Sequence, residues 1–167
     1  GLGGHCIPIA PFFLSWKARQ NGFESRFIEL AGHVNASMPR YVVERVAEAL
    51  NSRELSVRGS RVHLCGMAYK PNVGDVRESP SLDIANLLIR QGANVSYSDP
   101  HVGVVREGGL ALDEVPLLQA LDDGVDVAVI TTHHDDFDYD AIVRLSPVVV
   151  DTRNSLRGID AAHIFRL

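Results

Sequence analysis

The sequence predicts an α/β protein in which a helical segment, built on one long central helix, precedes a doubly wound parallel sheet. Two observations carry this prediction. From Ile28 to Asn51 apolar residues recur at three- and four-residue steps, which is typical of one face of an amphipathic helix. After residue 60, short apolar runs alternate with helical segments of about ten residues, which is typical of βαβ units and of a sheet buried on both faces.

The region before the long helix mixes glycine, proline and aromatic residues, and we interpret it as a loop followed by a short helix. This short helix is expected from about Phe12 to Asn21, with Gly22 ending it. Within the long helix, Pro39 has no backbone N–H to donate, so we expect it to kink the helix or to split it in two.

A polar stretch at residues 52–60 interrupts the helical periodicity and predicts a connector between two domains, 1–58 and 59–167. In the second domain, apolar β-branched runs predict strands, and the amphipathic segments between them predict helices. The predicted strands cover residues 61–66, 94–98, 125–131 and 148–151, and the predicted helices cover residues 81–90, 115–121 and 139–145.

Composition narrows the classes of protein that the chain can belong to. Its 167 residues carry a net charge of −5, and no cluster of Lys and Arg offers a surface for nucleic acid. No apolar run is long enough to cross a membrane and no secretory signal is visible, so we expect a cytoplasmic protein.

The two cysteines, Cys6 and Cys65, lie too far apart for a CxxC motif, which argues against a disulfide scaffold and a zinc site. Because the chain begins at Gly1 within a glycine-rich turn, we expect it to be part of a longer one.

Ligands of open parallel sheets bind beyond the carboxyl ends of the strands, so the loops that follow the predicted strands are the places to look for a site. The first of these loops, residues 67–79, contains Lys70 and Arg77 as its only cations. Arginine suits bidentate contact with phosphate, and lysine suits a point-charge contact. At this level the alternative, that both are solvated loop charges, stays open.

The segment from Gly1 to Cys6 is not a dinucleotide fingerprint, because no strand precedes it and the GxGxxG spacing is absent. Its glycines nevertheless allow backbone N–H groups to approach a ligand closely, and a thiol beside such a turn could be exposed and reactive. The alternative is a buried, inert cysteine. The acidic run 133–140 lacks the Gly and Glu of a calcium loop, so we expect a solvated loop leading into a helix and no metal site.

Taken together, four ordered segments of this sequence resemble the carboxyl-terminal part of the UDP-glucose/GDP-mannose dehydrogenase family. They are GLGGHCIPIAPFFLSWKAR, NASMPRYVVERV, CGMAYKPNVGDVRESPSLDIANLLIRQGANVSYSDP and VVVDTRN. The cysteine segment and the DTRN ending look most like those of bacterial UDP-N-acetylglucosamine 6-dehydrogenases, with the UDP-N-acetylmannosamine and UDP-glucose enzymes as close alternatives.

The resemblance implies an oxidoreductase of polysaccharide biosynthesis that oxidises the C6 alcohol of a UDP-sugar to a carboxylate with two NAD+, through a cysteine thioester. Cys6 matches the family's nucleophile. The resemblance further implies homodimers that form through the helix at residues 28–51. Two other classes of function stay open: a UDP-sugar-binding module without catalysis, and an interaction domain without a ligand.

Individual site residues follow only from this resemblance. Those implied to contact the nucleotide sugar are Gly1, Leu2, Gly3, Lys70 and Arg153, with Asn154 as an alternative to Arg153 because the register there is uncertain by one residue. Those implied to contact the cofactor are Cys6, Ile7, Pro8, Ile9 and Arg77.

The sequence departs from the family pattern in two ways. The amino-terminal Rossmann domain is not among these residues, so we expect the chain to be inactive alone. In addition, the family's CxxxD motif has an aspartate four residues after the cysteine, where this chain has Ala10. A methyl group can neither accept a proton nor orient water, which predicts slow release of the acyl group from Cys6.

Overall fold

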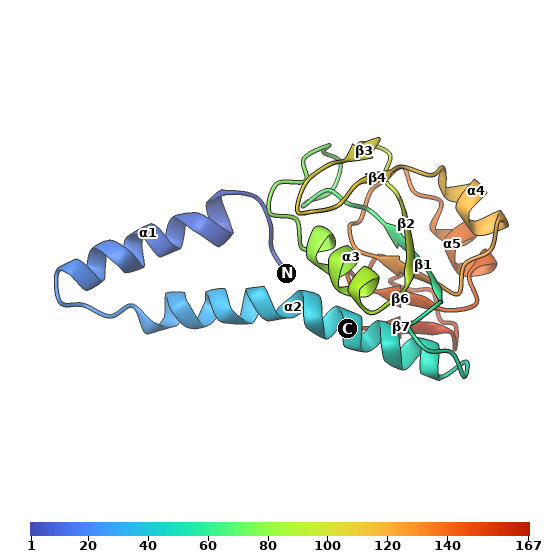
Figure 1. The fold of residues 1–167 in the computed structure, drawn as a ribbon, viewed down its shortest axis with the longest axis horizontal. Helices are drawn as coiled ribbons and strands as arrows, with labels where there is room; N and C mark the ends of the chain where they lie inside the picture. Colours follow the sequence, from blue (N-terminus) through green and yellow to red (C-terminus); the bar gives the residue numbers. More distant parts are fainter.

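The computed structural model describes residues 1–167 and shows a helical hairpin projecting from an α/β body (Figure 1). The hairpin is made by α1 (Cys6–Gln20) and the first half of α2 (Arg26–Asn51). The body contains β1 (Arg61–Cys65), α3 (Pro80–Arg90), β2 (Asn94–Ser98), β3 (Val104–Val105), β4 (Leu112–Asp113), α4 (Leu117–Asp122), β5 (Val127–Ile130), α5 (Tyr139–Leu145), β6 (Val149–Asp151) and β7 (Ile164–Arg166). No helix combines the length and the apolar character that crossing a bilayer requires.

Five parallel strands form the sheet in the order β2-β1-β5-β6-β7, which confirms the predicted parallel α/β architecture. The short strands β3 and β4 form a separate antiparallel pair that was not predicted, and neither was β7. The order of the strands reverses between β1 and β5. In open α/β sheets the carboxyl ends of the strands on either side of such a reversal are where ligands bind, so the loops after β1 and β5 frame the expected site.

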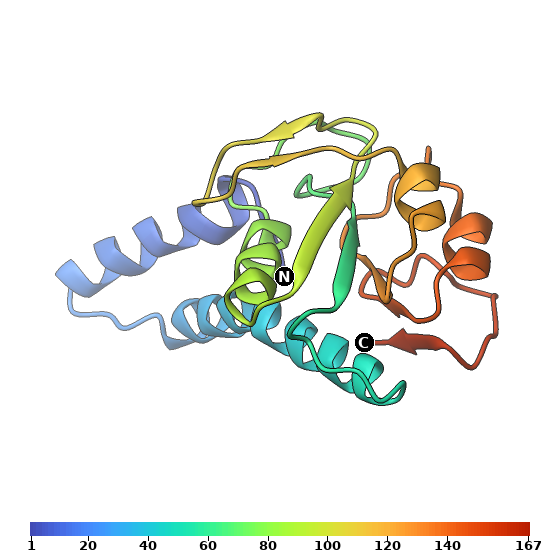
Figure 2. The same ribbon diagram turned by 45° about the vertical axis from the view of Figure 1, so that its right-hand side comes forward.

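Both faces of the sheet are covered, as Figures 1 and 2 show. Successive side chains of β5 alternate between two cores: Val127 and Val129 join the core beneath α2 and α3, whereas Ala128 and Ile130 join the core beneath α4 and α5. This alternation follows from the two-residue period of a strand. It explains why β5 is apolar without interruption.

Helix α1 begins at Cys6, earlier than the predicted start near Phe12. The prediction treated Pro8 as a sign of a loop. However, the first four N–H groups of a helix have no partner within the helix, so a proline in the first turn loses no hydrogen bond. The correction matters for the site, because Cys6 lies at the amino end of a helix rather than in the loop.

Helix α2 runs unbroken through Pro39, so the predicted split at this residue is wrong. Pro39 is buried, and the residues after it pack into the main core, with Val46 and Leu50 fully buried. The apolar face of the second half of α2 is therefore covered by this chain itself. Only the first half leaves an apolar stripe exposed, at Phe27, Leu30 and Val34.

The imidazole of His63 is buried in β1 between two serine hydroxyls. Its Nδ1 lies 2.8 Å from Ser96 Oγ and its Nε2 lies 2.8 Å from Ser98 Oγ. The Ser98 hydroxyl donates its proton to the carbonyl of Val115, so it accepts a hydrogen bond from His63 Nε2–H. Burial lowers the pKa of His63 from 6.5 to about 4.

We predict that acidification between pH 6.5 and 4 destabilises the fold through His63. Because the pKa of the folded state is depressed, the stabilisation is complete above pH 6.5 and is lost as the pH falls toward 4. The expected loss in free energy of unfolding is about 3 kcal/mol, measured by urea denaturation at several pH values. His63→Gln should flatten this dependence, whereas His33→Gln on the exposed surface of α2 should preserve it. An unchanged slope in His63→Gln would refute the assignment.

Candidate functional site

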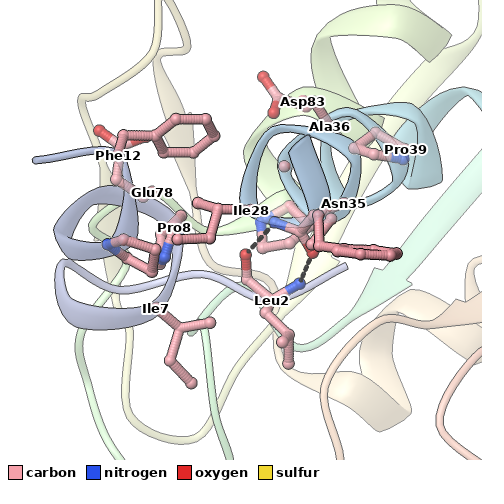
Figure 3. Close-up of a pocket in the computed structure, with 15 residues that line it drawn as sticks. Leu2, Ile7, Pro8, Phe12, Ile28, Asn35, Ala36, Pro39, Glu78 and Asp83 are labelled. Atoms are coloured by element: carbon pink, nitrogen blue, oxygen red, sulfur yellow. Dashed lines mark hydrogen bonds between the residues drawn. The ribbon is translucent and has the colours of Figure 1, made fainter. Parts of the chain in front are cut away.

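The amino-terminal loop, residues 1–4, lies over the carboxyl edge of the sheet and is held there by α2. The side-chain amide of Asn35 pairs with the backbone of Leu2 in both directions (Figure 3). Leu2 N donates to Asn35 Oδ1 at 2.6 Å, and Asn35 Nδ2 donates to the Leu2 carbonyl at 2.9 Å. This reciprocal pair satisfies both backbone groups of Leu2 and fixes the path of the chain toward Cys6.

Glycine is required at the next two positions because the loop after β1 packs against them. A Cβ on Gly3 would overlap the Glu78 carbonyl and would lie 2.8 Å from the Cβ of Tyr69. Gly4 has a positive φ of 81°, and a Cβ there would lie 2.9 Å from the Tyr69 ring. Gly4 N also donates to the carbonyl of Arg77 at 3.0 Å. The glycines thus allow two backbone segments to touch.

On the other side of the loop, Arg153 joins Gly1 to the end of β5. Its Nε donates to the Thr131 carbonyl at 2.6 Å, and its two terminal nitrogens each lie 3.3 Å from the Gly1 carbonyl. Burial lowers the pKa of Arg153. Gly1, Leu2, Gly3 and Arg153, which were predicted from widely separated parts of the sequence, are therefore close together.

Cys6 is exposed at the first position of α1, whereas Cys65 is buried at the end of β1. The amino end of a helix favours negative charge, such as that of a thiolate. Burial raises the pKa of the Cys65 thiol to about 12, which leaves that thiol protonated and inert. The structure therefore distinguishes one accessible thiol from one structural thiol.

A groove of about 590 Å³ separates α1 from α2 and the start of α3 (Figure 3). Ile7 and Pro8 line this groove, whereas Ile9, predicted alongside them, does not. Glu78 and Asp83 supply its acidic side, and burial, followed by the charge of Glu78, raises the pKa of Asp83.

The two cations of the loop after β1 differ in how they are held. The Lys70 side chain is exposed, and its Nζ lies 5.4 Å from the centre of the Tyr69 ring. The guanidinium of Arg77 is bound by the carboxylate of Asp75, with Nε at 3.0 Å from Oδ1 and a terminal nitrogen at 2.6 Å from Oδ2. Hydrogen bonds from Arg77 lower the pKa of Asp75 to about 2. Arg77 is thus oriented by a partner, while Lys70 is available to a ligand.

Beneath this loop lies a buried carboxylate, Asp99, which follows β2. Burial alone would raise the pKa of Asp99, but hydrogen bonds from His134 and from three backbone N–H groups hold it below its usual value. The sequence analysis singled out neither Asp99 nor Asn35, and it considered His134 only as part of the acidic run 133–140, for which no metal site was expected. No group of three or more His, Cys, Asp or Glu side chains is arranged to hold a metal ion.

Models of two domains of one protein family match this chain. The model for the UDP binding domain of the UDP-glucose/GDP-mannose dehydrogenase family matches residues 63–158, and the model for the central domain of that family matches residues 1–37. The chain therefore belongs to the UDP-glucose/GDP-mannose dehydrogenase family.

Several curated relatives match most of this chain. UDP-N-acetyl-D-mannosamine dehydrogenase of Methanococcus maripaludis is 36% identical over 93% of the chain and 36% of the relative. NDP-N-acetyl-D-galactosaminuronic acid dehydrogenase of Ralstonia nicotianae is 34% identical over 92% of the chain and 35% of the relative. UDP-N-acetyl-D-glucosamine 6-dehydrogenase of Pseudomonas aeruginosa is 35% identical over 60% of the chain and 24% of the relative. The chain spans about a third of the length of the first two relatives.

Solved structures show the same fold. UDP-D-ManNAc dehydrogenase from Pyrococcus horikoshii superimposes with a TM-score of 0.82 at 25% identity, covering 99% of this chain and 38% of that one. A UDP-glucose dehydrogenase from Pyrobaculum islandicum gives a TM-score of 0.77 at 31% identity, covering 99% of this chain and 37% of that one.

We predict that Gly3→Ala loosens the amino-terminal loop, because its methyl group would overlap the Glu78 carbonyl. Hydrogen exchange of the Gly4 amide, which is bonded to Arg77, should accelerate by roughly tenfold, as about 1.4 kcal/mol of lost local stability would produce. Gly103→Ala is the matched control, since nothing lies within 4 Å of a Cβ at that position. Equal exchange rates of the Gly4 amide in both variants would contradict the close packing of the amino-terminal loop against Tyr69 and Glu78.

Proposed function

We propose that this chain is the carboxyl-terminal part of an NAD-dependent nucleotide-sugar 6-dehydrogenase in which Cys6 is the nucleophile. The observation that carries the proposal is the exposed Cys6 thiol at the amino end of α1, two residues after a glycine loop that is fixed at the carboxyl edge of the sheet. Membership of the family supports the same reaction class.

The proposed substrate is a UDP-N-acetylhexosamine. Three relatives named above are dehydrogenases of N-acetylated sugars, and this shared feature favours an N-acetyl group over glucose. UDP-N-acetylglucosamine, which the sequence motifs around the cysteine and at DTRN favour, stays a prediction. UDP-N-acetylmannosamine is its main alternative, because a relative that matches most of the chain is a dehydrogenase of that sugar. In this proposal the backbone of residues 1–3 and the side chains of Lys70 and Arg153 contact the nucleotide sugar.

The residues near the thiol fit one side of a nicotinamide cofactor. Ile7 is 59% exposed, and together with Pro8 it offers an apolar surface beside Cys6 that suits the flat face of a nicotinamide ring. Arg77, whose guanidinium is oriented by Asp75, supplies positive charge for a phosphate of the cofactor. Bound NAD+ would supply the hydride acceptor for each of the two oxidations.

Cys6 would act after the C6 alcohol has become an aldehyde. Its thiolate sulfur forms a bond to the carbonyl carbon, and the oxygen takes a proton to give a thiohemiacetal. Loss of a hydride from C6 and of the hydroxyl proton then leaves a thioester. Water adds to that carbonyl, the carbon–sulfur bond breaks, and the products are the carboxylate and the regenerated thiol. Sulfur suits this role because its anion is both a good nucleophile and a good leaving group.

Because Ala10 cannot act as a general base, hydrolysis of the thioester should be the slow step of the reaction. Ala10 lies four residues after Cys6 on α1, so both residues lie on one face of the helix. We predict that the full-length protein, given a UDP-N-acetylhexosamine and NAD+, accumulates an acyl adduct on Cys6 that intact-mass spectrometry detects. Ala10→Asp should restore a general base, remove the adduct and raise turnover by roughly 10²- to 10⁴-fold.

Two cysteine variants control this experiment. Cys6→Ser should abolish the adduct, whereas Cys65→Ala, which removes the buried thiol, should keep it. Rapid turnover with no adduct in the parent protein would refute the prediction that thioester hydrolysis is slow. An adduct on any residue other than Cys6 would refute the proposed nucleophile.

We also propose that the protein is a homodimer that associates through the first half of α2. Phe27, Leu30 and Val34 are 87%, 57% and 54% exposed. Their spacing of three and four residues places them on one face, as in the seam between two paired helices. The second half of the helix was also predicted to lie in the interface, but its apolar face packs into the core of this chain.

We predict that Val34→Glu converts the dimer to a monomer in sedimentation velocity, because a charge in an apolar seam would lose its water on association. Glu44→Lys, an exposed change on the second half of the same helix, should remain dimeric. A monomeric parent protein at tens of micromolar, or a dimeric Val34→Glu variant, would contradict the proposed interface.

A further inference from the structure

A fully buried ion–imidazole pair lies beneath the loop that carries Lys70. The side chains of Asp99 and His134 have no exposed surface, and His134 Nε2 lies 3.2 Å from Asp99 Oδ2. The same oxygen accepts hydrogen bonds from Met67 N at 2.7 Å and from Ala68 N at 3.0 Å. Asp99 therefore binds the first residues of the loop that follows β1.

The other nitrogen of His134 binds the same loop further along. Asn72 N donates to His134 Nδ1 at 3.0 Å. A backbone N–H can only donate, so Nδ1 must carry a lone pair, and the proton of the neutral ring must lie on Nε2, facing Asp99. The imidazole thus uses both nitrogens, one as donor and one as acceptor, and its tautomer is fixed by its partners.

Lys70 lies between these two anchors. On one side of it, Thr132 Oγ1 donates to the Ala68 carbonyl at 2.6 Å, in addition to the bonds made by Asp99. On the other side, Asn72 has a positive φ of 58°. Its side-chain amide makes two hydrogen bonds with Asp135: Asn72 Nδ2 donates to Asp135 Oδ2 at 2.8 Å, and Asp135 N donates to Asn72 Oδ1 at 3.0 Å. The backbone of residues 68–72 therefore has a fixed course, although the Lys70 side chain itself is exposed.

The pair also reaches the cysteine loop. Tyr69, between Ala68 and Lys70, packs its ring directly against Gly4, and Gly4 precedes Cys6 by two residues. Tyr69 has anchors of its own, because Asp99 binds Met67 N and Ala68 N, and Tyr69 N donates to the Asp75 carbonyl at 2.9 Å. Loss of the Asn72 bond alone should therefore move Lys70 and leave the surface beneath the glycine loop in place.

We propose that His134 is a positioning residue: its Nδ1 lone pair holds the Asn72 N–H and so presents Lys70 to the diphosphate of the nucleotide sugar. This inference rests on the proposed function, in which Lys70 contacts the substrate. His134 itself is buried and acts only through the loop, so its effect should fall on the binding of the nucleotide sugar.

Two substitutions separate the two hydrogen bonds of the imidazole. His134→Asn places an amide near the position of Nδ1 and can keep an acceptor for Asn72. His134→Gln places its amide near the position of Nε2 and keeps a donor for Asp99, but it loses the acceptor. Both variants remove the ring from the core, so the loss of packing is similar and each serves as the control for the other.

In steady-state assays of the full-length protein, His134→Gln should raise the KM for the UDP-N-acetylhexosamine by about tenfold, the effect of one hydrogen bond, with kcat and the KM for NAD+ unchanged. His134→Asn should stay within about threefold of the parent protein. Equal losses in both variants, or a loss in kcat rather than KM, would show a structural role and overturn the inference.

A double variant tests whether His134 acts through Lys70. If it does, Lys70→Ala with His134→Gln should bind the nucleotide sugar no more weakly than Lys70→Ala alone. Additive losses would overturn the positioning role while leaving the proposed function intact. If Lys70→Ala alone leaves the KM for the nucleotide sugar unchanged, the assignment of Lys70 in the proposed function fails, and this inference fails with it.

Hydrogen exchange gives a readout that needs no catalysis. In His134→Gln the Asn72 amide should exchange at least tenfold faster than in His134→Asn, while amides of β5 exchange equally in the two variants. Equal protection of Asn72 in both variants would overturn the inference, and matched protection of β5 would show that both variants are folded.

Discussion

A buried carboxylate must be surrounded by donors, and in this protein that requirement organises the edge of the sheet where the site lies. Asp99 has no exposed side-chain surface, so it keeps its charge only because N–H groups from its surroundings replace water. Those donors come from three loops, which follow β1, β2 and β5. Satisfying one charge therefore holds together the three loops that surround the crevice where the order of the strands reverses.

Much of the fold could be predicted because local signals agree with the tertiary structure. The strand at residues 94–98 and the helix at residues 139–145 have the predicted bounds, and Asp138 caps that helix by accepting from Ala141 N at 2.8 Å. Helix α2 is not split at Pro39, because burial of the neighbouring residues outweighs one missing hydrogen bond. The strands β3, β4 and β7 span only two or three residues, too few for a two-residue alternation to be visible.

The site was only partly predictable. Cys6 and Lys70 could be predicted because each lies within a continuous sequence motif. The residues of such a motif are close together in the sequence as well as in space. Asn35 and His134 could not, because their roles depend on partners 33 and 62 residues away along the chain. An asparagine in a helix and a histidine in an acidic loop carry no signal of these roles until the fold brings Leu2 and Asn72 beside them.

Helix α2 sets the spacing between the sheet and the cysteine loop. Val46 is fully buried in the core, while Asn35, eleven residues earlier on the same unbroken helix, holds Leu2, so the two attachment points are separated by about 16 Å of rigid helix. Inserting or deleting one residue between them would turn Asn35 away from Leu2 by about 100°. Homologues that keep this attachment should therefore tolerate changes of residue type in this stretch far more readily than changes of its length.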